Sequence, residues 1–322
     1  MNGNKVLILQ HHDIVNAGIT PKQCLEWVED SFRMKYDTTL PPKTSIHPQG
    51  DDFFNTMPCL LPKSHGRFAM KEVHRIAGQE PALGSDILLY DSVKGNLLAI
   101  LDGDWITTMR TGAVAALSAR LLKQPGTNTY SFIGLGNTAR ATALCIIEDN
   151  KGEQLTFRLM QYKDQAESFI ERFKDYANVA FEVTDDIHDF VAGAKVLISC
   201  ITAAKGLICD RDELYQPGML LIPVHTRGFQ NCDLFFDKVY GDDTGHVQGF
   251  RYFSQFKKYD ELSHVLLGEN PGRENDDERI LCYNIGIGLH DAIFASRIYD
   301  IMCNQSGVSS FFQYKETSKF WI

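Results

Sequence analysis

A glycine-rich segment near the middle of the chain has the spacing of a dinucleotide-binding turn. It reads GLGNTA from Gly134 to Ala139, between an apolar run that predicts a strand and a stretch that predicts a helix. In this context Gly134 allows a tight turn, Gly136 lets a pyrophosphate approach the backbone, and Ala139 allows the helix to pack closely on the strand. The helix that begins at Asn137 and Thr138 turns its free amide groups towards the anion. The segment therefore predicts binding of NAD or NADP.

The residue that usually distinguishes NAD from NADP is expected about 20 residues further on, at the end of the second strand. Here the sequence reads Met160-Gln161-Tyr162-Lys163 and contains no carboxylate to accept a hydrogen bond from the ribose 2′-hydroxyl. Nothing in this segment repels a 2′-phosphate, and Lys163 is compatible with one. Both cofactors therefore stay open.

Three basic residues upstream lie in segments that otherwise look folded and partly buried: Lys43, Lys71 at the end of a strand-like run, and Arg110 next to Thr111 in an Ala-rich stretch. A buried cation is costly unless it is paired, so each is either a structural ion pair or a ligand for an anionic substrate, and spacing alone favours the ion pair. An arginine fork suits a carboxylate, and a desolvated lysine can act as an acid or base near neutral pH. Taken one by one, four histidines are interpreted as surface or core residues: His47, His65, His74 and His225.

The first part of the chain predicts an antiparallel meander followed by one long helix. Proline-rich residues 40–48 must be extended or loop, because proline lacks the amide hydrogen and clashes with a preceding helical turn. A helix begins at Thr20-Pro21 and the long helix spans 105–123. The expected strands are 5–9, 55–61, 67–73, 85–90 and 97–102.

After residue 126 strands and helices alternate, which predicts a parallel, doubly wound sheet. A final helix over 288–302 has apolar residues that we assign to one face. The expected strands are 128–133, 155–160, 180–183, 196–199, 219–223 and 238–240, with helices over 138–148 and 164–176.

Composition restricts the class of protein. At about 150 residues per domain, 322 residues predict two domains, and 44% hydrophobic with 23% charged residues is typical of a globular protein. A net charge of −9 without a basic cluster argues against nucleic acid as a partner. Eight scattered cysteines without C-x-x-C or zinc-ligand spacing predict free thiols and no metal site. No apolar run is long enough for a signal peptide or a membrane span, so we expect a cytoplasmic protein.

Several motifs occur in a fixed order along the chain. They are Lys71 after a strand, LLYD at 88–91 with Gly95 and Leu98-Ala99, MRTGA at 109–113 followed by Ala115-Ala116, IGLG at 133–136, GDD at 241–243, PGR at 271–273 and GIGLHD at 286–291. In these motifs the chain resembles the ornithine cyclodeaminase/mu-crystallin family over nearly its whole length.

The resemblance implies a Rossmann-type dinucleotide-binding domain inserted into an α+β substrate and dimerisation domain, in a homodimer. The inserted domain would be residues 123–287, and the other would combine 1–122 with 288–322. The substrate would be a small amino or imino acid. Hydride transfer between its α-carbon and the nicotinamide ring would interconvert amine and imine.

The resemblance also assigns roles to single residues. Arg110 would hold the α-carboxylate, with Lys43 at a position where relatives often carry a carboxylate-binding arginine. Lys71 would lie beside the reacting α-carbon and nitrogen, and Thr111 would contact the dinucleotide phosphate. Additional lining residues are expected at Asn55, Met57, His225 and Arg227.

One departure from the family pattern concerns the reaction. Relatives that cyclodeaminate carry an acidic residue soon after the strand that here spans 219–224, and our alignment places Thr226 at that position. A hydroxyl of ordinary pKa does not relay protons as a carboxylate does. His225 and Asp233 are the two alternatives for this role.

Three functions follow. The first is an NAD(P)-dependent enzyme acting on the α C–N bond of a small amino acid, with ornithine cyclodeaminase as the nearest named activity. The second is a net amino-acid or opine-type dehydrogenase or a ketimine reductase. The third is a non-enzymatic, mu-crystallin-like binder of a nucleotide and a small ligand.

Overall fold

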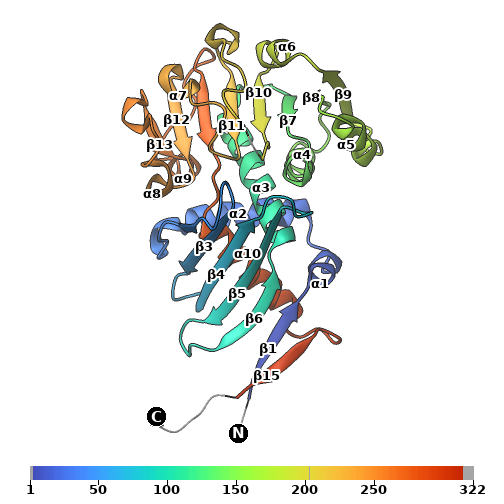
Figure 1. Cartoon of the computed structure of the whole chain (residues 1–322), viewed down its shortest axis with the longest axis vertical. Coiled ribbons are helices and arrows are strands. Elements are labelled where there is room, and N and C mark those ends of the chain that lie inside the picture. Colours follow the sequence, from blue (N-terminus) through green and yellow to red (C-terminus); the bar gives the residue numbers. More distant parts are fainter. Residues whose placement is uncertain (1–2, 203, 315–322) are drawn as a thin grey trace. The chain divides into compact units, whose positions relative to one another are not determined.

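The chain folds into two compact units in a computed structural model that describes residues 3–202 and 204–314 (Figure 1). Among the described residues, the first unit combines 3–20, 34–107 and 287–314, and the second combines 21–33 with 108–202 and 204–286. Segments 21–33 and 108–122 thus cluster with the second unit, whereas the sequence analysis assigned them to the first domain. The reason is that helix α2 (Pro21–Arg33) packs against α4 (Asn137–Asp149) and α9 (Leu262–Leu267).

The first unit contains a seven-stranded mixed sheet in the order β15-β1-β6-β5-β4-β3-β2. Its strands β3 to β6 form the predicted antiparallel meander, while β1 pairs parallel to β6 and antiparallel to β15. The strands are β1 (Asn4–Leu9), β2 (Thr44–Ile46), β3 (Phe53–Leu60), β4 (Arg67–Arg75), β5 (Leu83–Asp91), β6 (Leu97–Asp102) and β15 (Ser310–Gln313). Its helices are α1 (His11–Asn16), the 3-10 turn η1 (Lys35–Asp37) and α10 (Gly288–Met302).

The two faces of this sheet differ because side chains alternate along a strand. Helix α10 packs against β4 on one face of the sheet (Figure 1). On β4, Ala69 and Lys71 are buried on this face, whereas Phe68 and Met70 point to the other face and stay partly exposed. Helix α10 is buried on nearly all sides along residues 288–296, so the prediction of a helix with a single apolar face is wrong. The sheet itself occupies one side of α10, and the helix has no broad polar face.

The second unit contains an eight-stranded sheet in the order β13-β12-β14-β11-β10-β7-β8-β9, in which every pair of neighbours is parallel. The chain enters at β7, continues to β8 and β9 on one side, and then crosses to β10 on the other side, which is a doubly wound sheet. The strands are β7 (Thr129–Ile133), β8 (Leu155–Met160), β9 (Val179–Thr184), β10 (Val196–Ser199), β11 (Leu220–Pro223), β12 (Lys238–Gly241), β13 (Tyr259–Glu261) and β14 (Ile280–Tyr283).

Helices connect these strands. Helix α3 (Asp104–Leu122) begins in the first unit and continues in the second. The other helices are α4, α5 (Gln165–Phe173), α6 (Ile187–Ala192), α7 (Cys232–Phe235), α8 (Thr244–Val247), α9 and the 3-10 turns η2 (Asp212–Leu214) and η3 (Phe253–Gln255). No helix of the part that the structure describes is long and apolar enough to cross a bilayer.

Candidate active site

The glycine turn lies at the switch point of the parallel sheet, between β7 and β10. Gly134 has a φ of +79°, and a Cβ on it would lie 2.6 Å from the Ile201 nitrogen and 2.7 Å from the Cys200 carbonyl carbon. The Cys200 amide donates to the Ile133 carbonyl at 2.8 Å, so the two strands diverge directly after this bond. Only glycine is accommodated at position 134, because any side chain there would collide with the backbone that follows β10.

Gly136 is different, because a Cβ on it would meet no atom within 4 Å. It is the N-cap residue of α4, whose first residue Asn137 is exposed and whose Ala139 is fully buried. The Leu135 amide donates to the Gln165 side chain at 3.2 Å, which fixes the turn from α5. An open cradle above a 13-residue helix, at the carboxyl edge of a parallel sheet, fits a dinucleotide pyrophosphate.

Thr111 lies close to this helix because α3 and α4 approach each other closely. A Cβ on Gly112 would lie 2.6 Å from the Ala141 carbonyl carbon, so Gly112 allows the contact. The turn of α3 that carries Thr111 therefore packs on the first turns of α4. This arrangement agrees with the phosphate contact expected for Thr111.

Arg110, one residue earlier on α3, is only 6% exposed. Its guanidinium lies against Gly286, whose φ is +81° and on which a Cβ would overlap that group. The Gly286 backbone N–H donates to the Asp242 carboxylate at 2.8 Å, and the Asn284 side-chain Nδ2 donates to the same carboxylate at 3.1 Å. Asn284 also bonds Ser118 on α3 at 3.1 Å. This buried network fixes the segment against which the Arg110 fork rests.

In the first unit, Lys71 on β4 is fully buried. Its Nζ lies 2.8 Å from Oδ2 of Asp291 on α10 and 3.4 Å from Oγ1 of Thr107 at the start of α3. The Thr107 hydroxyl in turn lies 3.1 Å from Ser85 Oγ on β5. Lys71 is therefore held as part of a buried ion pair with a hydroxyl beside it.

Asn55 and Met57 on β3 lie on the same face of the sheet as Lys71. Met57 is the register partner of Lys71, and Asn55 pairs with Val73 two residues further along β4. The Asn55 Oδ1 atom is buried and has no hydrogen-bond partner among the described residues. Lys43 precedes edge strand β2 and is half-buried. A polar ligand near Lys71 would therefore find an acceptor in Asn55.

His225 follows β11, at the carboxyl edge of the parallel sheet. Its Nε2 lies 2.7 Å from Ser199 Oγ at the end of β10, and its Nδ1 accepts from the Arg227 amide at 3.3 Å. Because Nδ1 accepts, Nε2 carries the proton of the neutral ring and donates to Ser199. Burial lowers the pKa of His225 to about 4, so the imidazole is neutral at pH 7. Thr226 and Arg227 are exposed.

Asp233, the second alternative for the missing acid, is enclosed in a hydrophobic core. It is 2% exposed on α7 and accepts a hydrogen bond of 2.7 Å from the Tyr283 hydroxyl. Burial raises the pKa of this carboxyl to about 6, while the Tyr283 hydrogen bond acts in the opposite direction. In the part of the chain that the structure describes, no contact joins Asp233 to His225, and the structure does not bring the two alternatives together.

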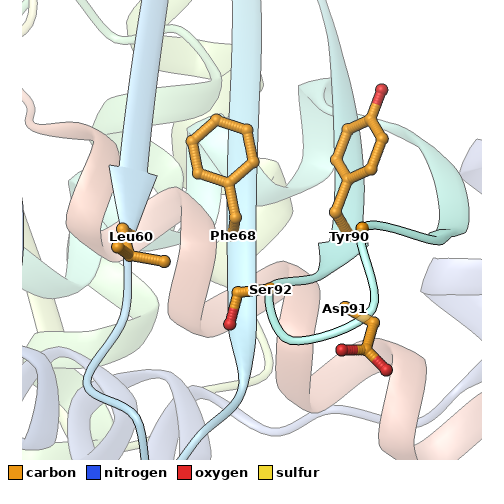
Figure 2. Close-up of a pocket in the computed structure, with 6 residues that line it drawn as sticks. Leu60, Phe68, Tyr90, Asp91 and Ser92 are labelled. Atoms are coloured by element: carbon orange, nitrogen blue, oxygen red, sulfur yellow. The ribbon is translucent and has the colours of Figure 1, made fainter.

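A hollow of about 310 Å³ lies on the other face of the mixed sheet (Figure 2). Leu60, Phe68 and Tyr90 stand side by side on three neighbouring strands, with the Phe68 and Tyr90 ring centroids 5.9 Å apart. Asp91, Ser92 and Gly95 complete it. Because Phe68 and Lys71 point to opposite faces, this hollow is separate from the Lys71 cluster.

Comparison with known proteins assigns the family. Residues 4–306 match the model of the ornithine cyclodeaminase/mu-crystallin family. The chain belongs to this family. Two curated relatives are the nodulation efficiency protein NfeD of Rhizobium meliloti, 24% identical over 85% of this chain and 87% of its own, and a delta(1)-pyrroline-2-carboxylate reductase of Bacillus cereus, 25% identical over 66% and 70%.

Solved structures show the same fold. The delta(1)-pyrroline-2-carboxylate reductase of Thermococcus litoralis, in complex with NADH and L-proline, superposes with a TM-score of 0.81 at 22% identity, covering 94% of this chain and 98% of that one. An archaeal alanine dehydrogenase dimer with bound NAD gives 0.81 at 18% identity, covering 96% and 99%. The predicted family and fold class are confirmed, and the expected NAD-type cofactor agrees with these two complexes.

Sequence reasoning missed three groups that complete the candidate site. Asp291 was seen only as the end of the GIGLHD motif, although a carboxylate directly before an apolar run, Ala292 to Ala295, is a sign of a buried partner. Asp242 was seen only as part of the GDD motif, and the Ser199 hydroxyl gave no local signal, because its partner His225 follows a different strand.

Proposed function

We propose that the chain is an NAD(P)-dependent oxidoreductase that reduces a small α-imino acid to the amino acid, and catalyses the reverse reaction, with net consumption or formation of reduced cofactor. A net redox reaction is favoured by the side chain that follows β11. This side chain is His225, a neutral imidazole that is hydrogen-bonded to Ser199. An ornithine cyclodeaminase would need an acid in this segment to move protons, and the enclosed Asp233 supports no such role.

The glycine turn and α4 support dinucleotide binding. The amides of Asn137 and Thr138 would bind the pyrophosphate, with Gly134 and Gly136 leaving room for it and Thr111 beside it on α3. When bound, the reduced nicotinamide supplies the hydride that the imine α-carbon accepts. The absence of a carboxylate at Gln161-Tyr162-Lys163 leaves NAD and NADP as alternatives.

Arg110 would bind the substrate carboxylate. Its planar guanidinium offers two parallel N–H donors, and the Gly286 segment behind it limits the orientations that the fork can adopt. Lys43 would add a second positive charge for the same carboxylate. A fixed carboxylate orients the α-carbon for attack from one face.

Lys71 would supply the proton. In the reductive direction its ammonium transfers a proton to the imine nitrogen, the C=N double bond becomes a single bond, and the α-carbon gains hydride, which gives the amine. Lys71 has the chemistry for this step, and Asn55 Oδ1 is an acceptor for the N–H that results.

The assay that tests this proposal follows cofactor and ammonia together. Purified protein with delta(1)-pyrroline-2-carboxylate and NADH or NADPH should form proline and oxidise cofactor in equal amounts. Ornithine with NAD that releases ammonia without net reduction of cofactor would instead establish a cyclodeaminase. Ligand affinity that persists unchanged in Lys71→Met and Arg110→Ala, without turnover of any imine or amine, would favour the mu-crystallin-like binder.

We also propose a homodimer in which a second copy covers the outer face of the mixed sheet. Leu60 lines the hollow beside Phe68 and Tyr90, Phe54 lies further along β3 on the same face, and each of the two is 40% exposed. A partly exposed apolar face of this kind marks an interface, and the archaeal relative is a dimer. Light scattering should give twice the chain mass for the native protein and for Val183→Lys, a control at a half-exposed residue of edge strand β9 in the second unit, but less for Phe68→Lys. A native monomer would exclude the dimer.

A further inference from the structure

The Lys71 ammonium depends on a carboxylate that is itself fully enclosed. Asp291 is 1% exposed and Lys71 is 0% exposed, and the distance between Nζ and Oδ2 is 2.8 Å. On the neighbouring strands the register partners of Lys71 are Met57 and Ile87, which are both apolar. An ammonium in such surroundings costs several kcal/mol unless an anion lies beside it. The charge on Lys71 therefore requires Asp291.

The position of Asp291 on α10 favours its ionised form. It lies in the first turn of a 15-residue helix, where the helix dipole stabilises a negative charge. Its effect extends to Cys59 on β3, because burial, and after it the charge of Asp291, raises the pKa of that thiol to about 12. The Cys59 thiol thus stays neutral, and the carboxylate remains available to Lys71.

Among the described residues, the other ionisable groups on the elements packed around this pair are as follows. The strand β5 contributes Ser85 and Ile87 on this face, and its Asp86 is exposed on the other face with Glu72 of β4. On the other elements beside the pair, the described ionisable groups are the buried His290, next to Asp291 on α10, Cys59 on β3, and Asp104 at the start of α3, which accepts a hydrogen bond of 3.1 Å from Ser85.

We propose that Asp291 is a positioning residue that keeps Lys71 charged and fixes its Nζ, so that Lys71 acts as the proton donor over the whole working pH range. The role of Lys71 as proton donor rests on the proposed function. The coupling between the Lys71 and Asp291 side chains does not depend on it. Without the carboxylate, the ammonium would lose its proton at lower pH, and the reductive reaction would fail on the basic side.

The coupling itself is tested in the free protein, without cofactor or substrate. In protein labelled with ¹⁵N-lysine, the Nζ signal that disappears in Lys71→Met belongs to Lys71, and its ammonium form is followed against pH. We expect the titration midpoint in Asp291→Asn to be lower than in the native protein by about one to three pH units. An unchanged midpoint would overturn the proposal.

The consequence for the reaction is tested by the pH profile of kcat/KM in the reductive direction. For Asp291→Asn the basic limb should move to lower pH by the same amount as the NMR midpoint, and kcat/KM above that limb should fall by about 10²-fold. Glu278→Gln is the matched control. It removes a carboxylate 3.0 Å from Lys238, the buried lysine of the second unit, and should leave the profile in place.

Two further outcomes separate the possible failures. If Asp291→Asn does not fold, Asp291→Glu is tested in its place. This variant keeps the charge but displaces it by one methylene, so the pH profile should stay in place while kcat falls. A shifted pH profile would overturn the proposal. If Lys71→Met keeps full activity, the proposed function fails. If Lys71→Met is inactive but a folded Asp291→Asn has the native pH profile, only the role of Asp291 is overturned.

Discussion

The two units hold a buried lysine in different surroundings. Lys71 in the mixed-sheet unit is paired with Asp291, and neither side chain reaches solvent. Lys238 in the parallel-sheet unit contacts Glu274 at 2.6 Å and Glu278 at 3.0 Å, and the Glu274 side chain is 49% exposed. Lys238 also donates to the Gly272 carbonyl at 2.6 Å. A partner near the surface can be hydrated when its counterion is lost, whereas an enclosed partner cannot.

The comparison shows how one residue type serves two purposes. Lys238 anchors the segment of the PGR motif, and Arg273 of this motif donates to the Leu122 carbonyl at 2.8 Å, where α3 ends. These contacts hold the fold of the parallel-sheet unit. The Lys71 pair lies beside Asn55 and Thr107 instead, where its charge serves the proposed proton transfer.

The largest expected effect separates the two lysines directly. Lys71→Met should lower kcat/KM by about 10²- to 10⁴-fold because it removes the proton donor. It should also lower the free energy of unfolding by about 3–5 kcal/mol, since Asp291 is left as an unpaired buried charge. Lys238→Met should lower the unfolding free energy less and leave kcat/KM nearly native. Kinetics and chemical denaturation measure both, and equal kinetic losses in the two variants would refute the contrast.

Arg110 extends the comparison to two arginines on one helix. Arg110→Ala should raise KM for the substrate by about 10²-fold, as it removes a charge-assisted carboxylate fork, and leave the dinucleotide Kd nearly native. Arg120 bonds Glu29 at 2.6 Å and Asp149 at 2.9 Å at the surface, so Arg120→Ala should change neither constant. Equal loss of substrate and dinucleotide affinity in Arg110→Ala would contradict the assigned role.

The glycine turn gives a contrast within the parallel-sheet unit. Gly134→Ala should destabilise the fold by at least about 1–2 kcal/mol, since its φ is +79° and a Cβ would strike the backbone after β10. Gly136→Val should destabilise the fold less than Gly134→Ala, because its Cβ position is open and only the N-cap preference of α4 is lost, but it should bind dinucleotide at least about tenfold more weakly by excluding the pyrophosphate. Fluorescence titration and thermal melting check the pair; native affinity in Gly136→Val would exclude the turn as the binding site.

Local patterns predicted the elements whose signals are local. The glycine turn, the meander and helix α3 follow from spacing, turn residues and composition within short windows. Strand β14 was missed, although it lies inside the parallel sheet between β11 and β12, because its four apolar residues show no alternation and periodicity does not distinguish such a short run from a buried helical segment.

The candidate site was predicted unevenly for the same reason. Lys71 and Arg110 were singled out as basic residues in apolar segments, and the family motifs gave them their roles. The contacts of the site residues join distant segments instead: Asp291 is 220 positions from Lys71, and Ser199 is 26 positions from His225. No window of sequence contains such a pair. A carboxylate directly before an apolar run, such as Asp291, is the one local sign of a long-range partner.

The smallest expected effect concerns His225 and Asp233, the two alternatives for the acidic residue that cyclodeaminating relatives carry. The pKa of His225 is lowered from 6.5 to about 4, so its contribution to stability is present above pH 6.5 and is lost as the pH falls to 4. The pKa of Asp233 is raised from 3.8 to about 6, so its contribution is present at low pH and is lost as the pH rises to 6. Between pH 4 and 6 the contributions of His225 and Asp233 to the unfolding free energy change in opposite directions. His225→Gln should therefore make the unfolding free energy fall less on acidification, and Asp233→Asn should make it fall more, each by about 1–2 kcal/mol over this window. Urea unfolding at several pH values measures both slopes, and a change of the same sign in the two variants would show that burial does not control these groups.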